Sequence, residues 1–313
     1  MGKFGDYQPR LNRKIHEVNE PRFSIFQLII LVGLITSIFF GIKHFKKSST
    51  EIAGVKTTSS TTLESSPSPQ IEQKAPAPAP IAKKNPTVQG IFDNEIPNLD
   101  GHWAVIVKDL KTGETYQYNQ NDVFPSASLY KLATMWATFQ AINDGKLSMD
   151  DTVGSWTVKD ALNAMITASD NDSAVALSES LGWDNIESLM HKEGFNSYDL
   201  TSPDSPFVNA SDIEALFERI YKNTAVSSSA SQQMKDLLFA QQINDRIPAM
   251  LPTDIAVAHK TGDIDDYRHD AGIIIGKKSD YIFVFLTQTP YPADTPNTIA
   301  DLSKRIFNAL ESQ

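Results

Sequence analysis

The strand patterns of this 313-residue chain fall into two groups with a long helical block between them. Alternating apolar residues predict strands over 102–109 and 115–119, and apolar runs predict three more over 255–259, 271–275 and 281–287. A sheet built from both ends of a chain, with helices inserted between them, is typical of the α+β class. We therefore predict a three-layer α/β/α arrangement: a five-stranded antiparallel sheet flanked by helices, with an inserted all-helical subdomain.

The helix that follows the second strand begins with a serine and a lysine three residues apart. Apolar residues recur at helical spacing from Leu129 to Ile142, so Ser128 and Lys131 lie one turn apart on one face. Backbone N–H groups and the helix dipole favour negative charge near such a serine. Burial lowers a lysine pKa, which makes the amine a base for the neighbouring nucleophile. A serine and a lysine on the surface of an ordinary helix give the same short pattern. Other parts of the chain must therefore show whether Ser128 is a nucleophile.

Two further polar triplets lie at the ends of predicted elements. Ser169-Asp170-Asn171 separates two apolar helices, and Lys260-Thr261-Gly262 follows the strand over 255–259. Taken alone, the first triplet is typical of a turn between helices. A second Lys-Thr-Gly, residues 111–113, falls between the first two strands, where a hairpin turn explains it better than a functional site.

The first 90 residues differ in composition from the rest. Residues 1–22 are polar, and the twenty residues 23–42 carry no charge, which is enough for a helix to span a bilayer of about 30 Å. The apolar run is long and no small-x-small cleavage site follows it, so we predict an uncleaved signal anchor rather than a cleaved signal peptide. Residues 43–90 have the Ser, Thr, Pro and Ala content of a disordered linker. The remainder, 91–313, is predicted to be one exported catalytic domain at the outer side of the cell membrane.

The domain is acidic and lacks thiols. From residue 91 onward it has 32 acidic and 16 basic residues, a formal net charge of −16, so nucleic acid is not expected as a partner. The absence of cysteine excludes disulfides, thiol catalysis and cysteine-ligated metals. No metal or other cofactor is expected, because the histidines of the domain show no ligand-type spacing: His102, His191, His259 and His269.

Ser-x-x-Lys, Ser-Asp-Asn and Lys-Thr-Gly, in this order, are the signature of penicillin-recognising serine enzymes. Each occurs here in the context that this family requires: a helix start, a loop between helices and a strand end. From about residue 95 onward the chain resembles class A β-lactamases. Three dipeptides add to the likeness: Phe124-Pro125, Leu251-Pro252 and His269-Asp270. The resemblance implies a β-lactamase/transpeptidase-like fold and an acyl-enzyme mechanism.

The resemblance also implies catalytic roles for four residues. Ser128 would attack the carbonyl carbon of a β-lactam or a D-alanyl peptide and form the acyl-enzyme. Lys131 would take or relay the serine proton. Ser169 and Lys260 would pass a proton to the leaving nitrogen. Asp170 is expected to be a structural hydrogen-bonding residue.

Substrate-binding roles follow in the same way. Asn171 would orient the substrate amide, and Lys260 with Thr261 and Gly262 would form the subsite for the substrate carboxylate. The backbone N–H groups of Ser128 and Asp263 would form the oxyanion hole. Arg268 is interpreted either as a second carboxylate clamp or as an arginine on the strand surface.

One part of the class A pattern is absent. Those enzymes carry a glutamate in a Glu-Pro-x-Leu-Asn motif that activates the deacylating water, and no such motif lies between Asn171 and Lys260. Asp204 lies in the corresponding stretch, between Pro203 and Ser205, where a turn role and a catalytic role are both open. Acylation is therefore expected to be intact and deacylation to be slow.

Several functions compete for this pattern. β-Lactams and peptidoglycan stem peptides ending in D-Ala-D-Ala are both open as substrates. A non-catalytic β-lactam sensor is a further alternative, although residues 1–22 leave no room for an output domain. A Ser-His-Asp hydrolase is disfavoured because no Gly-x-Ser-x-Gly occurs in the sequence. We expect a monomeric domain whose partners are the small-molecule substrate and, through residues 23–42, the lipid bilayer.

Overall fold

A computed structural model describes residues 84–203 and 206–312 of the chain. The predictions for the N-terminal segment, the anchor over 23–42 and almost all of the linker lie outside this range, and so does Asp204. Within the described ranges, no helix combines the length and apolar content needed to cross a membrane.

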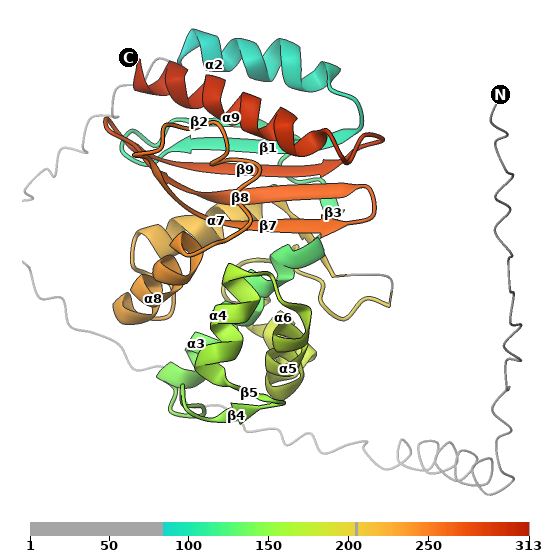
Figure 1. Ribbon diagram of the computed structural model, residues 1–313, viewed down its shortest axis with the longest axis vertical. Coiled ribbons are helices and arrows are strands. Elements are labelled where there is room, and N and C mark those ends of the chain that lie inside the picture. Colours follow the sequence, from blue (N-terminus) through green and yellow to red (C-terminus); the bar gives the residue numbers. More distant parts are fainter. Residues whose placement is uncertain (1–83, 204–205, 313) are drawn as a thin grey trace, which may run out of the picture. The chain divides into compact units, whose positions relative to one another are not determined.

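Five strands form one antiparallel sheet in the order β2-β1-β9-β8-β7 (Figure 1). Strand β1 from the start of the domain pairs with β9 near its end over eight residue pairs. The two predicted strand groups therefore meet in a single sheet, and the predicted fold class is confirmed. The strands of this sheet are β1 (His102–Asp109), β2 (Thr115–Tyr118), β7 (Ala256–Ile264), β8 (Tyr267–Ile275) and β9 (Asp280–Gln288).

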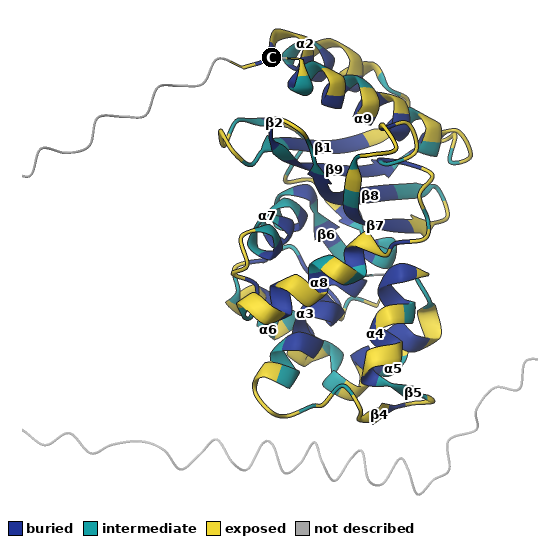
Figure 2. Ribbon diagram, turned by 60° about the vertical axis from the view of Figure 1, so that its left-hand side comes forward, coloured by how far each residue is buried: buried dark blue, intermediate teal, exposed yellow. Residues whose placement is uncertain are grey.

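The alternation of side chains along the strands supplies two separate cores. In β1, Val105 and Val107 pack into the core that the terminal helices share, whereas Ala104 and Ile106 belong to the core of the helical part. Helices α2 (Pro86–Gly90) and α9 (Thr295–Glu311) lie side by side over the first face, with the turns η2 (Ile91–Glu95) and η3 (Ile96–Asn98) between α2 and β1. Figure 2 shows the sheet buried between these helices and the helical part.

The helical part is inserted between β2 and β7, as the sequence predicts. Its helices are α3 (Tyr130–Asn143), α4 (Val158–Thr167), α5 (Asn171–Leu181), α6 (Trp183–Lys192), α7 (Ala210–Tyr221) and α8 (Ser228–Phe239). Two small ribbons complete it: β3 (Val123–Pro125) with β6 (Phe207–Asn209), and β4 (Thr152–Val153) with β5 (Trp156–Thr157). The 3₁₀ turn η4 (Ala127–Leu129) joins β3 to α3.

Strands β7 and β8 are longer than predicted. Their pairing continues through polar residues, from Lys260 opposite Ala271 to Ile264 opposite Tyr267. The hydrophobic pattern that marks a strand stops at His259, because the next residues serve a site rather than the core. Lys260-Thr261-Gly262 therefore lies within a strand and not at its end. Likewise, Ser128 lies in the 3₁₀ turn η4, and the α-helix α3 begins two residues later, at Tyr130.

Candidate active site

Ser128 is held in a short turn that strand β7 approaches closely. A Cβ atom placed on Gly262 would lie 3.3 Å from the Ser128 nitrogen and 3.3 Å from the Ser126 carbonyl oxygen. Only glycine fits this contact without displacing the turn. Strand β7 is at the edge of the sheet, so its open side faces η4. The sequence predicts that Ser128 and the Lys-Thr-Gly triplet share one site, and the structure brings them together.

Lys131 is fully buried and points at the loop between α4 and α5. Its Nζ donates hydrogen bonds to the Ser169 carbonyl oxygen at 2.6 Å, to Asn171 Oδ1 at 2.8 Å and to Ser169 Oγ at 3.3 Å. The loop is fixed from the other side, because the Asp170 carboxylate accepts the Ser173 N–H at 2.8 Å and caps α5. Asp170 therefore has the structural role that the sequence predicts.

Lys260 reaches the same hydroxyl from β7. Its Nζ donates to Ser169 Oγ at 2.8 Å and to the Thr261 carbonyl oxygen at 2.8 Å, and its side chain is also fully buried. Ser169 Oγ thus bridges Lys131 and Lys260. A hydroxyl between two amines is arranged to pass a proton from one to a group bound nearby.

Burial lowers the pKa of both amines. The pKa of Lys131 falls to about 8 because the side chain is desolvated, and the charge of Asp170 opposes this shift. The pKa of Lys260 falls to about 7, through desolvation and then through the charge of Lys131. Two ammonium groups that share one hydroxyl repel each other, so the cluster loses a proton near neutral pH. A neutral amine next to Ser128 can act as a base.

Backbone strain is concentrated at this cluster. Ala127 and Ser169 have positive φ angles of 45° and 57°, a conformation that costs a residue with a side chain about 1–3 kcal/mol. One precedes the serine, and the other supplies the bridging hydroxyl and the carbonyl that binds Lys131. Among the described residues, Ser128 Oγ itself makes no hydrogen bond to a protein group. Its hydroxyl is available to a substrate.

Asp263 follows the Lys-Thr-Gly triplet, and its carboxylate contacts two arginines. Arg246 Nη2 donates to Asp263 Oδ1 at 2.5 Å, and Arg268 Nε lies 3.2 Å from the same oxygen. Arg246 is buried and also donates to the His269 carbonyl oxygen at 3.0 Å. Sequence reasoning missed Arg246, since it lies in a loop without hydrophobic periodicity. It also did not anticipate a role for the Asp263 side chain.

A buried contact between His259 and Asp270 fixes the loop that carries Arg246. His259 Nδ1 and Asp270 Oδ1 are 2.8 Å apart, and both side chains are fully buried in neighbouring strands. Asp270 Oδ2 accepts the Ile247 N–H at 3.0 Å, and His259 Nε2 lies 2.9 Å from Asn244 Oδ1. Residues 244–247 are thereby tied to β7 and β8. The sequence offered only His259 at the end of one predicted strand and Asp270 just before the next, and it did not predict this contact.

His269 anchors the serine turn to the sheet. Its Nδ1 accepts the Thr287 N–H at 3.0 Å, so Nε2 carries the hydrogen that bonds to the Pro125 carbonyl oxygen at 2.8 Å. Burial lowers the pKa of His269 to about 4, which keeps this ring neutral. His269 thus holds the serine turn, and His259 holds the loop over 244–247. In the part of the chain that the structure describes, no cluster of three or more potential metal-ligating side chains occurs.

The described residues on either side of positions 204–205 contact neighbouring elements: Pro206 contacts the serine turn, and Leu200 and Thr201 contact α6. The Ser126 N–H donates to the Pro206 carbonyl oxygen at 2.6 Å. On the other side of Asp204, the Glu187 carboxylate accepts the N–H groups of Leu200 at 2.8 Å and Thr201 at 3.2 Å. Glu187 therefore positions this segment and is itself already bonded.

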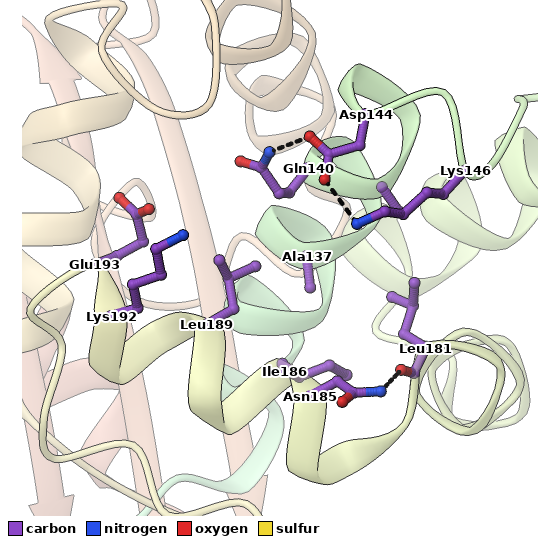
Figure 3. A pocket seen from close by; sticks show the side chains of 11 residues that line it. Ala137, Gln140, Asp144, Lys146, Leu181, Asn185, Ile186, Leu189, Lys192 and Glu193 are labelled. Carbon is purple, nitrogen blue, oxygen red and sulfur yellow. Dashed lines mark hydrogen bonds and ion pairs between the residues drawn. The ribbon is translucent and has the colours of Figure 1, made fainter.

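A separate hollow on the helical part lies between α3 and α6 (Figure 3). Asp144 bonds to Gln140 and Lys146 there, and Asn185 bonds to the Leu181 carbonyl oxygen. No residue of the lysine–serine cluster lines this hollow. The chemistry of the domain therefore belongs to the η4–β7 site.

Comparisons with known proteins agree with this geometry. The model of a family described as the beta-lactamase enzyme family matches residues 88–310. A beta-lactamase from Bacteroides uniformis is 22% identical over 252 residues, which cover 63% of this chain and 83% of that protein.

Solved structures show the same fold. A mutant of PBP-A, solved as an acyl-enzyme complex with penicillin G, has a TM-score of 0.68 at 20% identity and covers 73% of this chain and 97% of its own. The beta-lactamase of Sphaerobacter thermophilus has a TM-score of 0.67 at 20% identity, with 74% and 99% covered. Because the family model spans most of the chain and the lysine–serine cluster is in place, the chain belongs to the beta-lactamase enzyme family and is a serine hydrolase.

Proposed function

We propose that the chain is an exported, membrane-anchored enzyme that β-lactams acylate at Ser128 and that hydrolyses the β-lactam amide with slow deacylation. The observation that carries this proposal is the bridge from Lys131 through Ser169 Oγ to Lys260. It places a base and a proton donor on opposite sides of one hydroxyl, beside the turn that holds Ser128.

Acylation would proceed as a balanced proton transfer. Ser128 Oγ attacks the carbonyl carbon, and neutral Lys131 accepts the hydroxyl proton. As the carbon–nitrogen bond breaks, the leaving nitrogen takes a proton from Ser169 Oγ, which Lys260 replaces through its 2.8 Å hydrogen bond. The lowered pKa values of both amines support a pair that shares one proton near neutral pH. The Ser169 hydroxyl connects the two amines, and acylation uses the form in which this proton is on Lys260 and Lys131 is neutral.

Deacylation needs a second base that holds a water molecule. The sequence lacks the glutamate motif of class A enzymes between Asn171 and Lys260. Asp170, Glu187 and Asp263 lie on elements around the site, and each of these carboxylates already accepts hydrogen bonds from the protein. This distribution supports an acyl-enzyme that forms readily and persists.

A second candidate is a penicillin-binding enzyme that acts on D-alanyl peptides of peptidoglycan. The PBP-A mutant among the structural neighbours forms an acyl-enzyme with penicillin G. A site that acylates well and deacylates poorly with β-lactams fits this class. In that case the β-lactam is an inhibitor, and a stem peptide is the substrate.

Stopped-flow kinetics with a chromogenic β-lactam tests the fast acylation and slow deacylation that both candidates share. We expect a burst of about one equivalent followed by a steady state that is about 10²–10⁴-fold slower, because one positioned base is missing. Intact-mass measurement should show one adduct, which Ser128→Ala abolishes and Ser126→Ala retains. Fast turnover without a burst would contradict slow deacylation. An adduct on Ser128→Ala would overturn the nucleophile.

A further inference from the structure

The end of helix α4 is capped by a segment from a distant part of the chain. The last carbonyl groups of a helix have no hydrogen-bond partner within it. Here the buried Gln241 side chain donates from Nε2 to the Ile166 carbonyl oxygen at 2.9 Å, and the Gln242 N–H donates to the Thr167 carbonyl oxygen at 2.8 Å. Both acceptors lie in the last turn of α4, directly before the loop that carries Ser169.

The Gln241 side chain is oriented by its own neighbours. Its Oε1 accepts the backbone N–H groups of Gln242 and Ile243, each at 3.0 Å. An amide whose oxygen is engaged in this way presents its NH₂ group to the remaining partner. The bond from Gln241 to α4 is therefore set by the fold of the segment that follows α8.

The same segment is tied to strand β7, which carries Lys260. Asn244 Nδ2 donates to the Gln241 carbonyl oxygen at 3.0 Å, and Asn244 Oδ1 lies 2.9 Å from His259 Nε2. His259 is fully buried and directly precedes Lys260. A continuous path of hydrogen bonds therefore runs from β7 through Asn244 and Gln241 to the end of α4.

Ser169 joins the same two elements on the side of the active site. Its Oγ accepts a hydrogen bond from Lys260 Nζ at 2.8 Å, so β7 and the loop after α4 are connected twice. Ser169 has a positive φ of 57°, and a strained residue keeps such a conformation only where its surroundings fix it. The bond from Gln241 fixes the end of α4 just before Ser169, and this determines where the hydroxyl lies between Lys131 and Lys260.

Resting on the proposed acylation of Ser128, we propose that Gln241 is a positioning residue for the Ser169 hydroxyl and acts through the end of α4. Without its bond, the last turn of α4 loses a partner and Ser169 Oγ moves away from the leaving nitrogen. Attack by Ser128 is affected less, because Lys131 keeps its 2.8 Å bond to Asn171 Oδ1. The loss of Gln241 should therefore slow the step that protonates the leaving group.

The test compares two acyl donors with different leaving groups, by stopped-flow absorbance on the full chain. The leaving nitrogen of benzylpenicillin must gain a proton, whereas the phenyl ester of phenylacetylglycine releases phenolate without one. Gln241→Glu keeps the oxygen that binds the neighbouring N–H groups but loses the donor to α4. In this variant the acylation rate should fall about tenfold for the penicillin and less than about threefold for the ester. Ser169→Ala should show the same preference for the ester to a larger extent.

Gln242→Glu is the matched control. It adds the same charge at an exposed position, where the side-chain nitrogen lies 3.5 Å from Thr167 Oγ1 and the backbone bond to α4 is retained. Both acylation rates should stay unchanged in this control. Asn244→Ala, at another exposed position, cuts the path to His259 and should shift the rate ratio in the same direction as Gln241→Glu.

Asn244→Ala decides the question if Gln241→Glu does not fold. Equal losses for the two acyl donors in these variants, or a shifted ratio in Gln242→Glu, overturn the role of Gln241. Failure of both donors to acylate the unmodified chain overturns the proposed function instead.

Discussion

Two buried lysines set the chemistry of the site at the scale of single residues. Neither Lys131 nor Lys260 has measurable exposure, and Ser169 Oγ is bonded to both. Burying two amines is unfavourable unless at least one is neutral, so desolvation supplies the base that the reaction needs. The lysine side chains are thus more costly to stability than an apolar pair of the same size, which fits the catalytic role that we propose for them.

Lys131→Arg tests this interpretation. Arginine keeps the positive charge but cannot lose its proton in this pH range, so acylation by penicillin should fall by about 10²-fold or more. In the unmodified chain, the pKa values of about 8 for Lys131 and about 7 for Lys260 predict that acylation is fastest between about pH 7 and 8. The rate should rise towards this range as the pair loses its first proton and produces a base. It should fall above this range as the pair loses the second proton, which the leaving nitrogen needs.

The measurement is the labelling rate of Ser128 as a function of pH. Lys131→Arg should lose the ascending limb as well as the rate. Lys111→Arg, in the Lys-Thr-Gly of the β1–β2 hairpin, should leave both unchanged, because its Nζ bonds only to the surface Lys278 carbonyl oxygen at 3.3 Å. A normal pH profile in Lys131→Arg would identify another base.

At the scale of elements, the site depends on how closely the edge of β7 approaches η4. Gly262 permits a close contact between β7 and η4 that a side chain would widen. Ala127 in η4 and Ser169 in the loop between α4 and α5 have strained backbone conformations at the same site. The tie between His269 and the Pro125 carbonyl oxygen fixes the same turn from β8. Three elements that are far apart in sequence therefore position one hydroxyl.

Gly262→Ala should move β7 away from the turn by a few tenths of an ångström. We expect acylation to fall about 10–100-fold, because misplacement of reacting groups is costly. The free energy of unfolding should change by only about 1–2 kcal/mol, since the overlap is small. Gly90→Ala is the control: no heavy atom lies within 4 Å of its added Cβ, and its φ of −61° is helical. It should acylate normally, and equal losses in both variants would contradict the role of the β7–η4 contact.

At the scale of the whole molecule, the beginning and the end of the domain meet within the sheet and at its terminal helices. Strand β1 pairs with β9, and Asn85 Nδ2 donates to the Ala309 carbonyl oxygen at 2.8 Å, which ties the start of the described chain to α9. Asn85 is buried and its backbone N–H also donates to Glu114 Oε1 at 3.0 Å. Asn85 therefore fixes the start of the described chain to α9 and to β2.

A shortened chain starting at Lys84 should retain Ser128 labelling and remain in the supernatant after centrifugation of lysed cells. The full chain should sediment with membranes and resist carbonate extraction, because the twenty residues 23–42 carry no charge. Replacing Leu31 and Leu34 by arginine should release it. Recovery of a soluble full chain cleaved near residue 45 would indicate a signal peptide rather than an anchor.

The sequence by itself determined the elements of this protein and the identity of its three motifs. Hydrophobic periodicity is local, so the five strands and the helical insertion could be predicted from it. Ser128, Ser169 and Lys260 were instead assigned from the resemblance of their three motifs to those of penicillin-recognising serine enzymes. What only the tertiary structure decided is the set of contacts between elements. The extension of β7 through Lys260-Thr261-Gly262 depends on pairing with β8 and on the turn that covers it. The Arg246–Asp263–Arg268 contacts and the His259–Asp270 contact join a loop and two paired strands, and such polar contacts leave no periodic signal because they depend on where the backbone has already brought the side chains.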